Sequence, residues 1–165
     1  MPVENIDEAM RLIENWMAGR RLTTAIPKEG VEFKEVLSFA YSCKTPTGLG
    51  LAIVQPKNTA RTILVASRVD IAKQHLDVLG SMDVSEFEDF ILELRMALVL
   101  APTMFQILPL QGMPNSIQLS LEISFDELTE GRLNSALSNI TKTSVLIVLL
   151  FRKKFGLQII GESEK

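Results

Sequence analysis

Apolar residues near the start of the chain recur with the period of a helix. They are separated by four, three and four residues, which puts them on one helical face. Asn5 precedes the first of them, and Glu8 follows three residues later, which is the spacing of a capping box. Gly19 provides a helix stop. The pattern predicts an amphipathic N-terminal helix. Its apolar face holds Ile6, Met10, Ile13 and Met17.

Beyond Pro27 and Gly30 the apolar period changes to two, which is typical of strands with one buried face. Three such segments are separated by the turn sequences Thr45–Gly48 and Pro56–Asn58. Consecutive strands joined by short loops pair antiparallel, so the sequence predicts a three-strand antiparallel meander. The predicted strands are Leu37–Cys43, Leu49–Val54 and Thr62–Val69.

The second half of the chain predicts a short helix, Ile71–Gly80, followed by a stronger one. Ser85 and Glu88 have the capping-box spacing at the start of the stronger helix, and Pro102 ends it. The apolar face of this helix holds Phe87, Phe90, Ile91, Leu94 and Leu98. Two alternating segments predict strands over Met104–Leu110 and Ile117–Ile123.

A final helix is predicted after Asp126, which can cap it. Its apolar stripe runs from Leu133 to Phe155. The stretch Thr143–Leu149 is rich in β-branched residues, and propensity alone would also allow a strand there. We favour a helix because the stripe continues through this stretch. Residues 157–165 are expected to form a frayed end.

The order helix, three-strand meander, helix, two strands and helix predicts an α+β fold with helices packed on one face of an antiparallel sheet. No repeat or linker interrupts this order. Residues 1–165 are therefore expected to form a single domain, since their number is typical of one domain.

The element order resembles that of type III secretion chaperones and YbjN-like proteins. An uncharacterised archaeal family predicted to share that fold is more similar still. The stretches that carry the resemblance are Ile6–Trp16, Thr47–Val54, Ile63–Val69 and Ile117–Phe125. The resemblance implies an acidic homodimer that holds an extended segment of a partner protein.

Composition and charge exclude several kinds of partner. Hydrophobic residues make up 47% and charged residues 22% of the chain, which is typical of a globular protein. The net charge of −3 gives no positive excess for nucleic acid. The longest apolar run, Val145–Phe151, is far shorter than the roughly 20 residues that span a bilayer. Residues Met1–Gly19 lack a signal-peptide pattern. We expect a cytoplasmic protein without a membrane span.

Candidate catalytic and cofactor-binding groups are few. The chain has one histidine and one cysteine, which cannot form a Cys/His zinc site alone. His75 is expected on a helix surface beside Leu76, and Cys43 is expected in the core. The Gly48–Gly50 segment enters a strand, so it predicts a turn and not a dinucleotide site. We predict no catalytic residue, metal site or cofactor, and the protein is not expected to be an enzyme.

Two charged clusters are interpreted as solvated helix surfaces. The acidic residues lie away from the apolar face of their helix, near its start, where the helix dipole favours them. They are Glu86, Glu88, Asp89 and Glu93. The basic run Arg152–Lys154 suits a helix C-terminus, with Phe151 and Phe155 in the core. Contact with a membrane or with nucleic acid is the alternative for the basic run.

The helix that starts near Ser85 carries more apolar surface than one packed face requires. Either the sheet and the other helices bury the excess, or a second subunit or a partner segment does. The second alternative predicts a partner or dimer surface. Its residues are Met96, Val99, Leu100, Met104 and Phe105.

These observations lead to two functional hypotheses. The leading one is a non-catalytic, chaperone-like protein-interaction domain that acts as a homodimer and binds a protein segment. The alternative is a small-molecule sensor with a pocket between sheet and helices, although no polar cluster in the sequence locates such a pocket.

Overall fold

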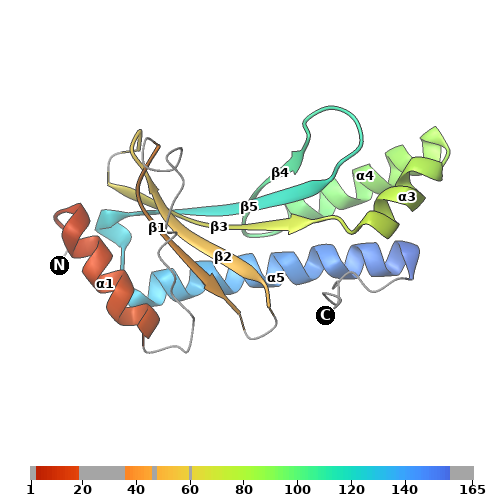
Figure 1. Ribbon diagram of the computed structural model, residues 1–165. Helices are drawn as coiled ribbons and strands as arrows, with labels where there is room; N and C mark the ends of the chain where they lie inside the picture. Colours follow the sequence, from red (N-terminus) through yellow and green to blue (C-terminus); the bar gives the residue numbers. More distant parts are fainter. Residues whose placement is uncertain (1–2, 19–35, 46–47, 60, 157–165) are drawn as a thin grey trace. The chain divides into compact units, whose positions relative to one another are not determined.

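A computed structural model of the protein describes residues 3–18, 36–45, 48–59 and 61–156 (Figure 1). The elements in chain order are α1 (Ile6–Ala18), β1 (Leu37–Lys44), β2 (Gly50–Pro56), β3 (Thr62–Asp70), α3 (Lys73–Ser81), α4 (Val84–Val99), β4 (Met104–Leu108), β5 (Ser116–Ser124), the short 3-10 helix η1 (Phe125–Glu127) and α5 (Glu130–Phe155).

The five strands form one sheet in the order β1-β2-β3-β5-β4. β2 pairs antiparallel with β1 on one side and with β3 on the other. Backbone hydrogen bonds join the start of β3 to the end of β5, and the end of β3 to the start of β5. Phe125 N donates to Arg61 O at 2.8 Å, and Ile71 N donates to Asn115 O at 2.9 Å. The predicted α+β fold and its three-strand meander are therefore confirmed.

The chain folds as two compact units. The first unit comprises Met1–Ser67 and Ser120–Ile140, and the second comprises Arg68–Leu119 and Thr141–Lys165. β3, β5 and α5 each contribute residues to both units. Each unit has buried apolar residues of its own. A single domain over residues 1–165 stays a prediction.

The core of the first unit is built from alternate positions of its strands and from one face of its helices. Buried strand residues include Phe39, Tyr41, Cys43, Leu51, Ile53, Ile63 and Val65, and buried helix residues include Ala9, Ile13, Met17, Leu133, Leu137 and Ile140. The intervening strand residues Ala40, Ala52 and Leu64 are only half-buried. One face of the sheet is thus more deeply buried than the other, in agreement with the predicted one-sided packing.

The core of the second unit contains an aromatic cluster that joins three helices. His75 comes from α3, Phe90 from α4, and Phe151 and Phe155 from α5. The ring centroids of Phe90 lie 5.2 Å from those of Phe151 and Phe155, with near-perpendicular rings. The His75 ring lies 5.7 Å from Phe151 and 5.4 Å from Phe155. Edge-to-face contacts, such as those of Phe90 with Phe151 and Phe155, are favourable beyond the area that they bury.

The start of α1 agrees with the prediction, but the start of α4 does not. Asn5 Oδ1 accepts a hydrogen bond from Glu8 N at 2.9 Å, as the capping box requires. At α4 the cap is Asp83, whose Oδ1 accepts from Glu86 N at 2.9 Å. The prediction of Ser85 as the cap is wrong. Asp and Ser cap equally well, and the chain offers both within three residues.

The predicted cap of α5 is also wrong. Asp126 lies in η1, whose turn is closed by the hydrogen bond from Leu128 N to Phe125 O. Thr129 Oγ1 accepts from Arg132 N at 3.1 Å and caps the helix instead. The helical prediction for Thr143–Leu149 is confirmed, since this stretch lies within α5.

Other boundaries moved by a few residues. β4 ends at Leu108, because Pro109 has no N–H to donate to a strand ladder. The short helix predicted from Ile71 begins at Lys73. Gly19, the segment from Pro27 to Gly30, and residues 157–165 lie outside the described residues.

Candidate functional site

The predicted partner surface lies at the end of α4 and on β4. The exposed fractions are 60% for Met96, 71% for Val99, 85% for Leu100 and 53% for Met104. Phe105 is half-buried. Of the two alternatives for these residues, burial by the rest of the described chain therefore does not hold for the first four. The name α4–β4 surface is used below for these five residues.

Hydrogen bonds fix the chain segment that joins α4 to β4. Leu100 N donates to Met96 O at 3.3 Å, and Ala101 N donates to Leu98 O at 3.2 Å. Next along the chain, Thr103 is buried, and its hydroxyl lies 3.3 Å from the hydroxyl of Thr143 in α5. The exposed apolar side chains at the end of α4 thus belong to a segment whose backbone is held by hydrogen bonds.

β4 is an edge strand, since it ends the strand order. Its sequence, Met-Phe-Gln-Ile-Leu, carries no charge, and none of its five residues is fully buried. Natural proteins usually protect an edge strand with charged residues or proline, because an open edge can pair with another chain. Here Pro109 limits the strand only at its end.

Three further exposed apolar residues were not part of the predicted surface. They are Leu92 on α4, with an exposed fraction of 57%, and Val145 and Leu149 on α5, with 50% and 54%. Val145 and Leu149 are four residues apart, so they share one helix face. Their spacing was visible in the sequence, but the long apolar run around them gave no way to tell the outer face from the buried one.

His75 does not lie on the helix surface, so that prediction is wrong. Its side chain has no exposed surface, and neither ring nitrogen has a hydrogen-bond partner among the described residues. Burial lowers the pKa of His75 below its ordinary value of 6.5. A catalytic base must reach its substrate, and this imidazole faces phenyl rings instead.

Cys43 lies in the core, as predicted. Burial raises the pKa of its thiol to about 11, so the nucleophilic thiolate form is scarce at neutral pH. Its neighbour on the same strand face, Tyr41, donates a hydrogen bond from its hydroxyl to Glu14 Oε1 at 2.9 Å. Burial, together with this carboxylate, raises the pKa of Tyr41 above its ordinary value of 10.0.

The Gly48–Gly50 segment forms the predicted turn into β2. Gly48 has a positive φ of 84°, and its N–H donates to Thr45 O at 2.9 Å. Thr45 N in turn donates to Leu49 O at 2.9 Å. The segment is followed by a strand, so it lacks the helix N-terminus of a dinucleotide site.

The two charged clusters partly neutralise each other. Glu93 Oε1 lies 2.8 Å from Lys153 Nζ, and Glu86 Oε1 lies 2.9 Å from Lys154 Nζ. Phe151 is buried, while Phe155 is half-buried. The remaining acids on α4 are exposed. Among the described residues, no group of three or more His, Cys, Asp or Glu side chains is placed to hold a metal ion.

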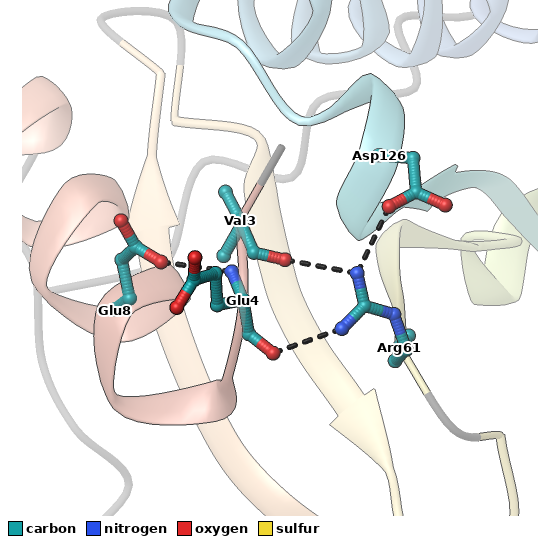
Figure 2. A network of polar contacts seen from close by, with 5 residues as sticks. All are labelled: Val3, Glu4, Glu8, Arg61 and Asp126. Carbon is teal, nitrogen blue, oxygen red and sulfur yellow. Dashed lines mark hydrogen bonds and ion pairs between the residues drawn. The ribbon is translucent and has the colours of Figure 1, made fainter. Parts of the chain in front are cut away.

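A polar network in the first unit has no counterpart in the sequence predictions (Figure 2). The guanidinium of Arg61 donates to Glu4 O at 2.8 Å and to Val3 O at 3.0 Å, and it pairs with Asp126 at 2.9 Å. The same group lies 5.7 Å from the centre of the Phe125 ring. The network fastens the segment before α1 to η1. Its role is structural. No periodic pattern of apolar and polar residues along the chain indicates it.

α5 is long and apolar enough, by length and composition, to cross a membrane. Core helices of soluble proteins share these properties. Leu133 and Ile140 of this helix are buried in the first unit, and Ile147 and Phe151 in the second, which accounts for part of its apolar character. The absence of a membrane span stays a prediction.

Comparisons with known proteins bear on family and fold. Residues 9–151 match the family described as uncharacterized conserved protein (DUF2299). An uncharacterized protein from Methanothermobacter thermautotrophicus has a similar structure, with a TM-score of 0.79 at 23% identity over 90% of this chain and 99% of that one. The resemblance predicted from the sequence is confirmed at the level of family and fold.

Two other solved structures are less similar. The structure of the ExsC–ExsE complex gives a TM-score of 0.49 at 14% identity, over 85% of this chain and 90% of that chain. YbjN from E. coli gives 0.48 at 10% identity, over 90% and 93%. No curated protein is significantly similar to this chain.

Proposed function

The chain belongs to the uncharacterized conserved protein family DUF2299, and we propose that it is a non-catalytic protein-interaction domain that acts as a homodimer. The observation that carries this proposal is the α4–β4 surface. Four of its five residues are more than half exposed, although all five are apolar. Contiguous exposed apolar patches on soluble proteins typically mark the sites where other proteins bind.

The open edge of β4 supports a protein segment as a further ligand. An extended segment can add to a sheet edge through backbone hydrogen bonds, while pockets for alternate side chains give specificity. Met104 and Gln106 are exposed on β4, and the apolar end of α4 lies just before it in the chain. An apolar, extended segment suits this combination.

The positions of His75 and Cys43 support a non-catalytic role. Both side chains are buried, and burial disfavours the charged form of each. General acid–base and nucleophilic catalysis both need a group that reaches the substrate in the appropriate protonation state. The two residues whose chemistry suits catalysis best are therefore placed where catalysis is least favoured.

The homodimer is tested by the molar mass in solution, measured by light scattering across a dilution series. We expect twice the 18.4 kDa of the chain for the wild type at high concentration. Met96→Asp should shift the protein to monomer, because an interface would bury the new carboxylate without a partner. Met96→Leu is the matched control and should stay dimeric. A wild type that is monomeric at every concentration would contradict the proposal.

The partner segment is tested by affinity capture from lysate of the source organism. We expect the wild type to retain one protein in near-stoichiometric amount and Met104→Asp to lose it, with circular dichroism showing that the variant is folded. Recovery of the bait alone would count against a partner segment and would favour the small-molecule alternative. The cytoplasmic location stays a prediction.

A further inference from the structure

We propose that the two copies meet through α4 and α5, with α4 of each copy packed on α5 of the other. This inference rests on the homodimer proposed above and specifies which faces meet. It adds Val145 and Leu149 to the interface, and it predicts a polar contact at the rim.

α4 and α5 run antiparallel in the second unit. Glu86 pairs with Lys154, Glu93 pairs with Lys153, and Thr103, just after α4, contacts Thr143. Residue numbers on α5 therefore fall as those on α4 rise. The second and third contacts are ten residues apart on both segments, so Met96 lies at the level of Leu150, next to Leu149. Leu100 lies at the level of Leu146, next to Val145.

The exposed apolar residues of α4 and α5 form two rows that run along the helices. Lys153, Leu149 and Val145 follow one another at steps of four, so they form one row on α5. Lys153 at one end of this row reaches Glu93, so the row begins beside α4, and it runs along the exposed side of α5. On α4, Glu93 is followed at steps of three and four by Met96 and Leu100.

The two rows therefore form one apolar strip, called the α4–α5 face below. Its residues and exposed fractions are Met96 (60%), Leu100 (85%), Val145 (50%) and Leu149 (54%). An apolar strip this exposed on neighbouring helices is typical of a helix-packing interface that lacks its partner.

The charges at one end of the face favour a second copy as its occupant. Asp89 lies about two turns before Met96 on α4, and Arg152 lies one turn after Leu149 on α5. Both are exposed, and neither has an ion pair in the described part of the chain. Because the helices are antiparallel, the acid and the base lie at the same end of the face.

A twofold axis parallel to the helices leaves each end of the face opposite the same end of the other copy. It sets α4 of one copy on α5 of the other, so Asp89 meets Arg152 twice, and Met96 and Leu100 meet Leu149 and Val145. A twofold axis across the helices would instead set Asp89 against the apolar end of α4. Charge complementarity therefore favours the first arrangement.

Cysteine cross-linking tests this arrangement directly. Cys43 is buried with a raised pKa, so it contributes little background. Met96→Cys and Leu149→Cys are purified separately, mixed, oxidised mildly and separated on a non-reducing gel. We expect a covalent dimer in the mixture and much less in either variant alone. Leu110→Cys, which is 74% exposed and outside the face, is the matched control for exposure.

Two outcomes would overturn the arrangement while leaving the homodimer in place. Cross-linking of Met96→Cys with itself in preference to the mixture would show that α4 packs on α4. A dimer by light scattering without any cross-link at these positions would place the interface elsewhere. A monomer by light scattering would instead contradict the homodimer itself, so the two failures are distinguishable.

Charge reversal gives an independent readout. Asp89→Arg and Arg152→Asp should each weaken dimerisation by about tenfold, because every dimer contains the contact twice and each reversal makes it repulsive. The double variant should restore the wild-type dissociation constant, and the two single variants should prefer each other in a mixture. Equal weakening without rescue in the double variant would contradict the proposed contact.

Discussion

The two compact units differ in where their large apolar side chains lie. In the described part of the first unit, only Ile6 and Val36 are large, apolar and exposed. In the second unit the exposed large apolar residues are Val84, Leu92, Met96, Val99, Leu100, Met104, Leu110, Met113, Val145 and Leu149. Apolar surface of that extent has a cost in water unless something covers it.

The polar side chains of the two units differ in what they join. The first unit ties distant segments together with side-chain bonds, as Arg61 does with Val3, Glu4 and Asp126 (Figure 2). In the second unit, ion pairs join two helices, as Glu93 of α4 does with Lys153 of α5. Buried side-chain atoms without a hydrogen-bond partner among the described residues occur in both units, at Gln55 and Asn134 in the first and at His75 in the second. The comparison therefore teaches that the exposed apolar surface, and not the pairing of polar groups, sets the second unit apart.

The largest expected effect separates the inner and outer faces of α5. Phe151→Ala should lower the free energy of unfolding by about 3–5 kcal/mol, because it leaves a cavity among the aromatic rings. Leu149→Ala, two residues away and exposed, should change it by less than about 0.5 kcal/mol. Urea unfolding in dilute protein measures both. Similar losses for the two variants would show that the outer face is already packed in the monomer.

A smaller effect is expected at Arg61 in the first unit. Arg61→Ala removes two hydrogen bonds to backbone carbonyls and one ion pair, all half-exposed, and should cost about 1–2 kcal/mol. The backbone here has φ of 60°, which glycine adopts freely. Arg61→Gly should therefore be more stable than Arg61→Ala by about 0.5–1 kcal/mol. Thermal unfolding of the two variants measures this difference. Equal stabilities of Arg61→Gly and Arg61→Ala would argue against a strained backbone at this position.

The smallest expected effect is a pH dependence in the second unit. Because the folded protein holds the pKa of His75 below 6.5, the unfolded chain binds the proton more readily. This contribution to stability is fully present above pH 6.5 and is lost as the pH falls toward the lowered pKa.

The control for this dependence is His75→Leu, which removes the titrating group and keeps an apolar side chain. The free energy of unfolding is compared between pH 7 and pH 5 by denaturant titration. The wild type should lose more stability than the variant over this interval. An identical loss in the two proteins would show that His75 does not titrate in an environment different from that of the unfolded chain.

The element order could be predicted from the sequence because burial imposes a period. The alternation through Tyr41 and Cys43, and the stripe through Phe90 and Leu94, reflect contacts that repeat along one element. Exact starts could not be predicted where two residues cap equally well. Asp83 rather than Ser85 caps α4, and Thr129 caps α5 because Asp126 lies in η1, ahead of the helix.

The site was predictable only in part. Met96, Val99 and Leu100 were identified because they lie off a stripe that was already clear. Val145 and Leu149 lie in a run where apolar residues occur on every side, so period alone could not separate the outer from the inner face. His75 was misplaced because its burial depends on Phe151 and Phe155, which lie far along the chain.

The most direct test of an interface on the second unit compares the same substitution in the two units. Val99 in the second unit and Val36 in the first are both exposed, at 71% and 59%. Val99→Asp and Val36→Asp should leave the fold intact, since both side chains meet water in the monomer. Light scattering should give a monomer for Val99→Asp and a dimer for Val36→Asp. Two dimers, or two monomers beside a monomeric wild type, would contradict the account.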